Sequence, residues 1–185
     1  FLKDITCYSL IIDNLSKTTT LSPIEKLTKL SSLHIWDSEN PINDLNRLRF
    51  SRNLLELSLS NIVLNDVNSL KINKKQLTSL MFRDSKIHSI DGLANYEKLH
   101  TLSLSLFNNN YNLRFLSKLS LETLSLQSIN NFGFVKSLPK LKTLKRLHLE
   151  SINFSKYNKL TEREKIASSK SPSNDEYRIR FERFF

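Results

Sequence analysis

The sequence predicts an α/β solenoid, in which a short coil of chain repeats and each copy adds one strand to a curved parallel sheet. The first observation is a motif of the form L-x-x-L-x-L, with conservative replacements, that starts at Leu2, Leu30, Leu54, Leu77, Leu99, Leu121 and Leu144. The second is its spacing, since the steps between starts are 28, 24, 23, 22, 22 and 23 residues. The third is the alternation of apolar and polar positions inside each motif, which is typical of a strand. About seven such repeats predict a solenoid with the sheet on its concave face and short helical or extended segments on its convex face.

The first coil is expected to be longer than the others. Its apolar positions are Leu2, Ile5, Cys7, Leu10 and Ile12. The 28-residue step that follows leaves room for a loop through the segment SKTTTLSP. Because proline is favoured in the first turn of a helix, we expect a short helix from Pro23 to Leu30, directly before the second strand.

The next six coils keep a step of 22 to 24 residues. In each, two inward positions of the strand are apolar: Leu33 and Ile35, Leu57 and Leu59, Leu80 and Phe82, Leu102 and Leu104, Leu124 and Leu126, Leu147 and Leu149. The fifth coil continues into the segment NNNYN, whose asparagines suit turns and left-handed backbone.

The repeat is lost after residue 154, and the sequence therefore predicts two parts, a solenoid over residues 1–154 and a basic capping segment over residues 155–185. In the second part, TEREKIA is expected to form a short helix, SSKSPSND a polar, flexible linker, and EYRIRFERFF an amphipathic last strand. That strand would cover the leucines of the last repeat; the alternative is a tail that docks on a partner. Since Phe1 already lies inside a repeat, we expect the N-terminal cap to be missing.

The composition excludes several classes of protein. Gly92 and Gly133 are the only glycines, so no glycine-rich phosphate loop can be drawn, which removes most nucleotide-dependent enzymes. Cys7 is the only cysteine, so an intrachain disulfide is impossible and a cytoplasmic or nuclear location is favoured. No apolar run approaches the roughly 18 to 20 residues that cross a bilayer, so no membrane insertion is expected.

With the repeats laid out, residues 2–154 resemble the leucine-rich-repeat superfamily. The segment Ile87-x-x-Ile90-x-Gly92-Leu93 is similar to the 22-residue class found in phosphatase regulatory subunits of the Sds22 type. The ninth position of each repeat, where that class places asparagine, holds other residues: Leu10, Ser38, Ile62, Ser85, Phe107, Ile129 and Ile152. That pattern resembles fungal F-box proteins instead, and residues 53–72 are similar to ubiquitin-ligase substrate receptors and to a centromere-complex F-box subunit. The F-box itself would lie upstream of Phe1.

The resemblance implies that the outward strand residues line the concave face and bind a partner. Most of them are serine or threonine, and the large ones gather towards the two ends. We expect a protein partner to contact Tyr8, His34, Trp36, Met81 and Arg83, because Trp, Tyr and Arg are the usual anchors of interfaces. The alternative is that Trp36 is covered by the missing N-terminal part. A second candidate patch consists of Arg146, His148 and Glu150, for which a solvated charged surface is the competing interpretation.

The net charge of +10 is expected to lie mainly outside the concave face. The basic residues of the return segments and loops are Arg47, Arg49, Arg52, Lys71, Lys74, Lys75, Lys136, Lys140, Lys142 and Lys145. Such a convex or edge field attracts acidic proteins or nucleic acid at long range. No recognition motif accompanies it, so lysine as a plain surface residue is the competing interpretation.

No enzymatic activity, metal or cofactor is expected. His34 and His148 share one outward column but stand five strands apart, roughly 24 Å at about 4.8 Å per strand, so one metal ion could not reach both. Asp84 and Asp91 have no partner placed for acid–base work. The sequence therefore predicts a non-catalytic module that binds protein, either the recognition part of an F-box protein, an Sds22-like subunit or a basic scaffold on nucleic acid.

Overall fold

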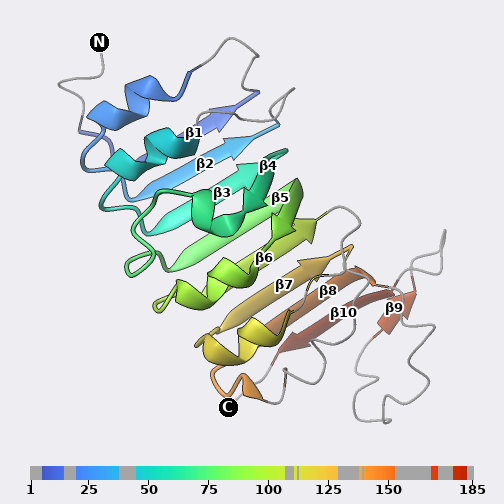
Figure 1. Ribbon diagram of the computed structural model, residues 1–185. Helices are drawn as coiled ribbons and strands as arrows, with labels where there is room; N and C mark the ends of the chain where they lie inside the picture. The colour runs from blue at the N-terminus through green and yellow to red at the C-terminus, as the bar shows by residue number, and fades with distance from the viewer. Residues whose placement is uncertain are drawn as a thin grey trace.

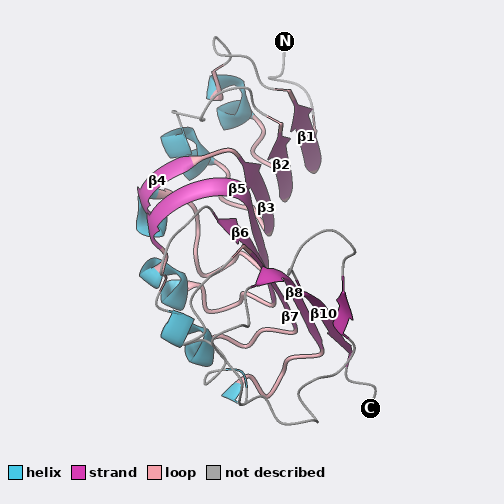
Figure 2. Cartoon of the chain, turned by 90° about the vertical axis from the view of Figure 1, so that its right-hand side faces the viewer, coloured by secondary structure: helices cyan, strands magenta, loops and turns pink. Residues whose placement is uncertain are grey.

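The computed structural model is a curved sheet with short helices on one side of it (Figures 1 and 2). It describes residues 6–14, 20–37, 45–106, 111, 113–128, 138, 140–152, 168–170 and 177–182. The strands are β1 (Ser9–Asp13), β2 (Ser32–Trp36), β3 (Glu56–Ser60), β4 (Val63–Asp66), β5 (Ser79–Ser89), β6 (Thr101–Leu106), β7 (Thr123–Gln127), β8 (Arg146–Ile152), β9 (Ser168–Lys170) and β10 (Tyr177–Glu182). The helices are of the 3₁₀ type: η1 (Ser22–Lys26), η2 (Leu45–Phe50), η3 (Val67–Ser69), η4 (Asp91–Asn95) and η5 (Leu113–Lys118).

The sheet follows the chain in order and confirms the predicted parallel solenoid. The strands run β1-β2-β3-β5-β6-β7-β8, each parallel to the next. β4 lies off this path and pairs with the second half of the long strand β5, and Figure 2 shows both curving away from the sheet towards the helices. The sheet lines the concave side, and the 3₁₀ helices form the outer arc.

The core lies between the sheet and the helices. The inward strand residues from β2 to β7, for example Leu33, Phe82 and Leu126, are fully buried. The first leucine of each coil from β2 to β7 is buried behind them, Leu144 before β8 is partly buried, and helix residues such as Leu48 and Leu116 are buried too. Burying one such side chain contributes roughly 1.5–3 kcal/mol. Each coil thus depends on its neighbours for the apolar surface that it cannot cover alone.

The first repeat was placed in the wrong register by the sequence analysis. β1 begins at Ser9, and the pairs Leu10–Leu33 and Ile12–Ile35 show that Leu10 and Ile12 are the inward residues of this coil. Its motif therefore starts at Cys7, and its step to Leu30 is 23 residues instead of 28. Leu2 and Ile5 lie outside the described residues. The apolar residue at position 2 was misleading because Cys7, a weaker signal than leucine, is the true counterpart of Leu30.

The expected helix from Pro23 to Leu30 is shorter and of another type. η1 spans Ser22–Lys26, and its buried residues Leu21, Ile24 and Leu27 recur every three positions. In a 3₁₀ helix, residues three apart lie above one another, so this spacing places every apolar side chain on the core side. The backbone bonds from Ile24 N to Leu21 O and from Leu27 N to Ile24 O, at 3.0 and 2.9 Å, have this three-residue step.

At the C-terminal end, β10 pairs antiparallel with β8 and also with β9. The segment EYRIRFERFF thus contributes a strand beside the last parallel one, while β9 occupies residues 168–170 of the segment expected to be a linker. TEREKIA, at residues 161–167, and most of NNNYN lie outside the described residues. The division into parts at residues 154 and 155 stays a prediction.

Candidate functional site on the concave face

The outward residues of the parallel strands form three columns across the concave face. The strand register aligns the first two columns as Ser9, Ser32, Glu56, Ser79, Thr101, Thr123 and Arg146, and Ile11, His34, Ser58, Met81, Ser103, Ser125 and His148. The alternation along each strand gives the third column as Asp13, Trp36, Ser60, Arg83, Ser105, Gln127 and Glu150. Small hydroxyl residues occupy most of the middle strands. The large side chains are concentrated on β2 and β5 and again on β8.

Tyr8 does not belong to these columns, which corrects its predicted position beside Trp36. It precedes β1, and its carbonyl oxygen accepts bonds from Ser31 N and Ser32 N at 2.8 and 3.0 Å. Tyr8 is therefore the counterpart of Ser31, at the edge where the strands begin. Its side chain is 59% exposed. The residue that stands beside His34 on the face is Ile11, also an exposed apolar residue.

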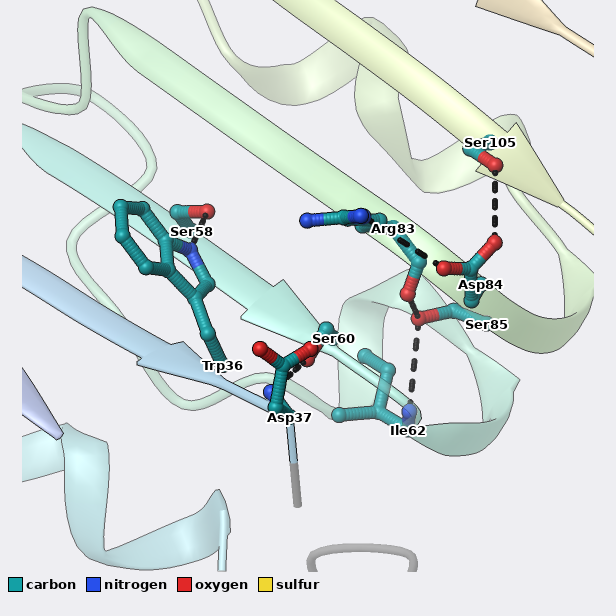
Figure 3. Close-up of polar contacts among 9 residues, drawn as sticks. All are labelled: Trp36, Asp37, Ser58, Ser60, Ile62, Arg83, Asp84, Ser85 and Ser105. Atoms are coloured by element: carbon teal, nitrogen blue, oxygen red, sulfur yellow. Dashed lines mark hydrogen bonds and ion pairs between the residues drawn. The ribbon is translucent and has the colours of Figure 1, made fainter. Parts of the chain in front are cut away.

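Trp36 is held in place by its neighbours on the face. The indole Nε1 donates a hydrogen bond to Ser58 Oγ at 2.9 Å, from β2 to β3 (Figure 3). The His34 ring packs edge-on against the indole, with 5.2 Å between the ring centroids and 66° between the planes. Trp36 is half-buried as a result. Its polar atom is satisfied, and its ring is fixed from two sides.

His34 is part of a short hydrogen-bonded chain. Its Nε2 lies 2.9 Å from Ser32 Oγ, and that hydroxyl donates to Glu56 Oε2 at 3.0 Å. Because the single hydroxyl proton of Ser32 points to Glu56, Ser32 accepts the proton of His34 Nε2. Nδ1 is then the acceptor of the ring, and it is buried with no partner among the described residues. This chain fixes the ring against which Trp36 packs.

Met81 and Arg83 project from β5, two strands from Trp36. Met81 is 38% exposed, near the centre of the face. The exposed Arg83 pairs with Asp84, with 3.5 Å between Nε and Oδ2, and Asp84 accepts a bond from Ser105 Oγ at 3.3 Å (Figure 3). The intervening β3 carries Ser58 and Ser60, both buried. We call His34, Trp36, Met81 and Arg83 the aromatic patch; the structure places these predicted residues on β2 and β5, with β3 between them.

Arg146, His148 and Glu150 lie together on β8, far from the aromatic patch. Arg146 Nε donates to Thr123 Oγ1 at 3.1 Å, and His148 Nε2 lies 3.3 Å from Glu150 Oε2. Five strand steps separate His34 from His148, roughly 24 Å. The face therefore carries two separate groups of large side chains. β10 pairs with β8 along this group's outer edge, from Arg146 to Ile152.

The residues at the ends of the strands were missed by the sequence analysis. The backbone is left-handed, with φ from 46° to 58°, directly after four strands, at Asn14, Asp37, Asn61 and Ser128, and inside β5 at Asp84. Asn and Asp tolerate this region better than other side chains. The sequence does carry a signal for these turns: Asn or Asp recurs at the eighth position of the repeat, one residue before the ninth position, which the sequence analysis compared with asparagine.

Buried serines tie these strand ends together from one coil to the next. Ser60 Oγ accepts from Asp37 N at 2.9 Å, and Ser85 Oγ accepts from Ile62 N at 3.3 Å (Figure 3). Ser85 occupies the ninth position of its repeat, where the 22-residue class places asparagine. The rim of the face beside Trp36 and Arg83 is thereby fixed.

Within the described ranges, no group of three or more His, Cys, Asp and Glu side chains could hold a metal ion. In the same part of the chain, no helix is long and apolar enough to span a bilayer. The arrangement on the face offers an aromatic ring, a thioether, an arginine and many hydroxyls. Together these groups suit contact with a surface of another molecule.

The fold is that of leucine-rich-repeat proteins. A Leptospira interrogans leucine-rich-repeat protein matches with a TM-score of 0.53 and 20% identity, over 82% of this chain and 45% of its own. Internalin C2 from Listeria monocytogenes matches with a TM-score of 0.48 and 26% identity, over 69% of this chain and 54% of its own. A second Listeria monocytogenes internalin matches with a TM-score of 0.48 and 25% identity, over 79% of this chain and 48% of its own.

This chain thus spans about half the length of the solved structures that it matches. No protein-family model matches it, and no curated protein sequence does. The predicted leucine-rich-repeat fold is confirmed. The resemblance to fungal F-box proteins and to Sds22 stays a prediction.

Proposed function

We propose that this leucine-rich-repeat solenoid binds another protein on its concave face, through the aromatic patch. The observation that carries the proposal is the state of Trp36, which is ordered by Ser58 and His34 yet still half-exposed. Trp and Arg are the commonest anchors of protein interfaces. A side chain that is already fixed loses little rotamer freedom on binding, which favours affinity.

The serines around the patch support a protein as the partner. Ser58, Ser103 and Ser125 are short residues of the central column, so the side chains of Trp36 and Met81 extend further from the sheet than their neighbours do. A broad surface with a few large side chains suits a protein contact, whereas small ligands are usually enclosed in a pocket. Arg146, His148 and Glu150 then serve as a second, peripheral contact.

A non-catalytic role is part of the proposal. Of the two histidines on the face, His34 is engaged with Ser32 and His148 with Glu150, and roughly 24 Å separate them. Asp84 pairs with Arg83 and Ser105. These groups orient one another, and each is well suited to recognition.

The more specific form of the proposal is that the chain is the recognition part of a fungal F-box protein, in a ubiquitin ligase or a centromere complex, in the nucleus or cytoplasm. Its support is the sequence resemblance of residues 53–72. The alternative is an Sds22-like regulatory subunit, supported by the segment Ile87 to Leu93. An F-box upstream in the full-length gene favours the first, and co-purification of phosphatase activity favours the second.

Replacing Trp36 by alanine tests the protein-binding proposal. Proteins captured from cell extract by the wild-type chain are identified, and the Kd of the purified partner is then measured by calorimetry. Loss of an interface anchor costs about 2 kcal/mol or more, so Trp36→Ala is expected to weaken the Kd by roughly 30-fold. The melting temperature should change little, because Trp36 lies outside the leucine core.

The matched control is Val63→Ala. Val63 is an exposed apolar residue of β4, outside the concave columns, and its replacement should leave the Kd unchanged. If Trp36→Ala binds the partner as tightly as wild type, or if Val63→Ala weakens binding as much, the aromatic patch is not the binding site.

A further inference from the structure

A row of basic side chains lies along the edge of the sheet where the strands begin. The turns leading into β2, β3, β5 and β6 carry Lys29, Arg52, Lys75 and Lys98, whose numbers differ by 23 from one to the next. Lys118, the last residue of η5, precedes β7, and Lys142 lies in the turn before β8. Figure 1 shows that these turns follow one another along a single edge. We call these six residues the cation row.

The backbone aligns the strand starts that follow the row, and each cation lies three to five residues before the first residue of its strand. At each strand start, one backbone carbonyl oxygen accepts hydrogen bonds of 2.8 to 3.1 Å from two successive N–H groups of the next coil. The accepting carbonyl oxygens belong to Tyr8, Ser31, Leu55, Thr78, His100 and Glu122. The ladder runs without a break from β1 to β8. With about 4.8 Å between neighbouring strands, the six cations extend over roughly 24 Å.

The cations of the row are exposed and unengaged. All six side chains are exposed, and none makes a hydrogen bond or ion pair with another described residue. Other cations nearby are occupied, since Lys145 pairs with Glu122 at 3.1 Å and Lys74 lies over the Tyr96 ring at 5.9 Å. Glu97, beside Lys98, is the acidic residue within the turns that carry the row.

The concave face does not share this charge. Its strands carry Arg83 and Arg146 against Asp13, Glu56 and Glu150. The excess positive charge of the described solenoid is therefore directed away from the proposed protein-binding face, and the two surfaces can be occupied independently.

We propose that the cation row is a binding site for the phosphate backbone of nucleic acid. The row carries one charge per coil along one edge of the sheet, with neighbouring strands about 4.8 Å apart, and a linear polymer with a repeated anionic group matches such an array. A globular acidic protein would need a matching line of carboxylates. A lipid surface is a plane, which a single line of cations contacts poorly. Since the row consists of lysine and arginine side chains alone, it recognises phosphate and no base sequence.

The salt dependence of binding tests this directly. Fluorescence anisotropy with labelled single-stranded and duplex oligonucleotides of mixed sequence gives the slope of log K against log salt. Six phosphate contacts predict slopes of about −4 for single strands and about −5 for duplex. The variant K29Q/R52Q/K75Q/K98Q should lower the magnitude of the single-strand slope by about 3. Circular dichroism should show an unchanged fold, because all four side chains are exposed.

Two controls separate the row from overall charge. The first control is Lys86→Gln, which removes an exposed lysine from the second half of β5. Its salt slope is compared with that of Lys75→Gln. The second control, K156Q/K159Q/R163Q/K165Q, removes an equal number of positive charges, four, from residues 155–185. Both controls should retain the wild-type slope. An unchanged slope in the row variant, or an equal loss in the controls, overturns the proposal. So does binding to a poly-glutamate peptide or to phosphatidylserine vesicles without binding to oligonucleotides, which would indicate an acidic protein or a membrane.

Discussion

Asp66 illustrates how a single side chain closes a coil. It precedes η3, and its carboxylate accepts a hydrogen bond from Asn68 N at 2.5 Å. A hydrogen bond from the Ser89 side chain is the main cause that holds the pKa of Asp66 below its usual value of 3.8, with the bonds from Asn68 and the charge of Lys74 adding to it. The ionised carboxylate therefore stabilises the folded chain.

We predict that Asp66→Asn lowers stability at neutral pH but not in acid. Bonds to a charged acceptor exceed those to a neutral one by about 1 kcal/mol, so the variant should lose about that much at pH 7. Because the folded pKa is lowered, the stabilisation is fully present above the unfolded pKa of 3.8 and is lost as pH falls through the folded value. Urea denaturation of both proteins from pH 7 to pH 2 measures the difference. A difference that is constant with pH would contradict this assignment.

For single strand residues, the sequence predicts which side chains point outward but not what those side chains contact. Trp36, Met81 and Arg83 follow from the alternation of the strands, and the structure places them on the sheet face. The bond from Trp36 to Ser58 joins two coils, and it depends on a rotamer that alternation does not specify. Tyr8 was misplaced because an apolar residue at position 2 competed with Cys7 for the start of the first motif.

Each coil consists of a strand and a return segment, and neither is stable by itself. The strands of the middle of the sheet have a neighbour on both sides, whereas no described strand lies on the outer side of β1. Leu102 on β6 and Leu10 on β1 occupy the same position in their coils, but Leu102 is fully buried and Leu10 only partly.

We predict that Leu102→Ala destabilises the chain by about 2–5 kcal/mol, as expected for a leucine removed from a packed core. Leu10→Ala should cost less than half of that, since its coil contacts one described neighbour. Chemical denaturation of both variants measures the two costs. Equal costs would mean that the stability of the solenoid does not depend on the neighbours of each coil.

The elements could be predicted where one signal dominates. The parallel strands follow from the leucine motif, because only that alternation buries both leucines of each strand. Short helical segments were predicted on the convex face, but their 3₁₀ type was not, although buried residues every three positions, as at Leu21, Ile24 and Leu27, indicate it. β4 and the second half of β5 could not be foreseen, because their pairing depends on where the backbone turns after Asn61 and Asp84.

The whole molecule presents two surfaces of different character. The concave face has mixed charge and a fixed aromatic patch, while the edge at which the strands begin carries the cation row. The same repeat generates both, since the strand of each coil lines the concave face and the segment before the strand lies at the edge. Protein binding and phosphate binding are therefore expected to be separable by substitution.

The NMR resonance of the Met81 methyl group tests directly whether a protein partner binds on the concave face. Met81 is the only methionine of the sequence and lies 38% exposed on the proposed binding face. The methyl group of Met81 is labelled with ¹³C, and its resonance is followed while the captured protein partner is added. We predict that this resonance shifts or broadens with the partner and stays in place with an oligonucleotide. A saturated complex in which the Met81 resonance is unchanged would contradict binding on the concave face.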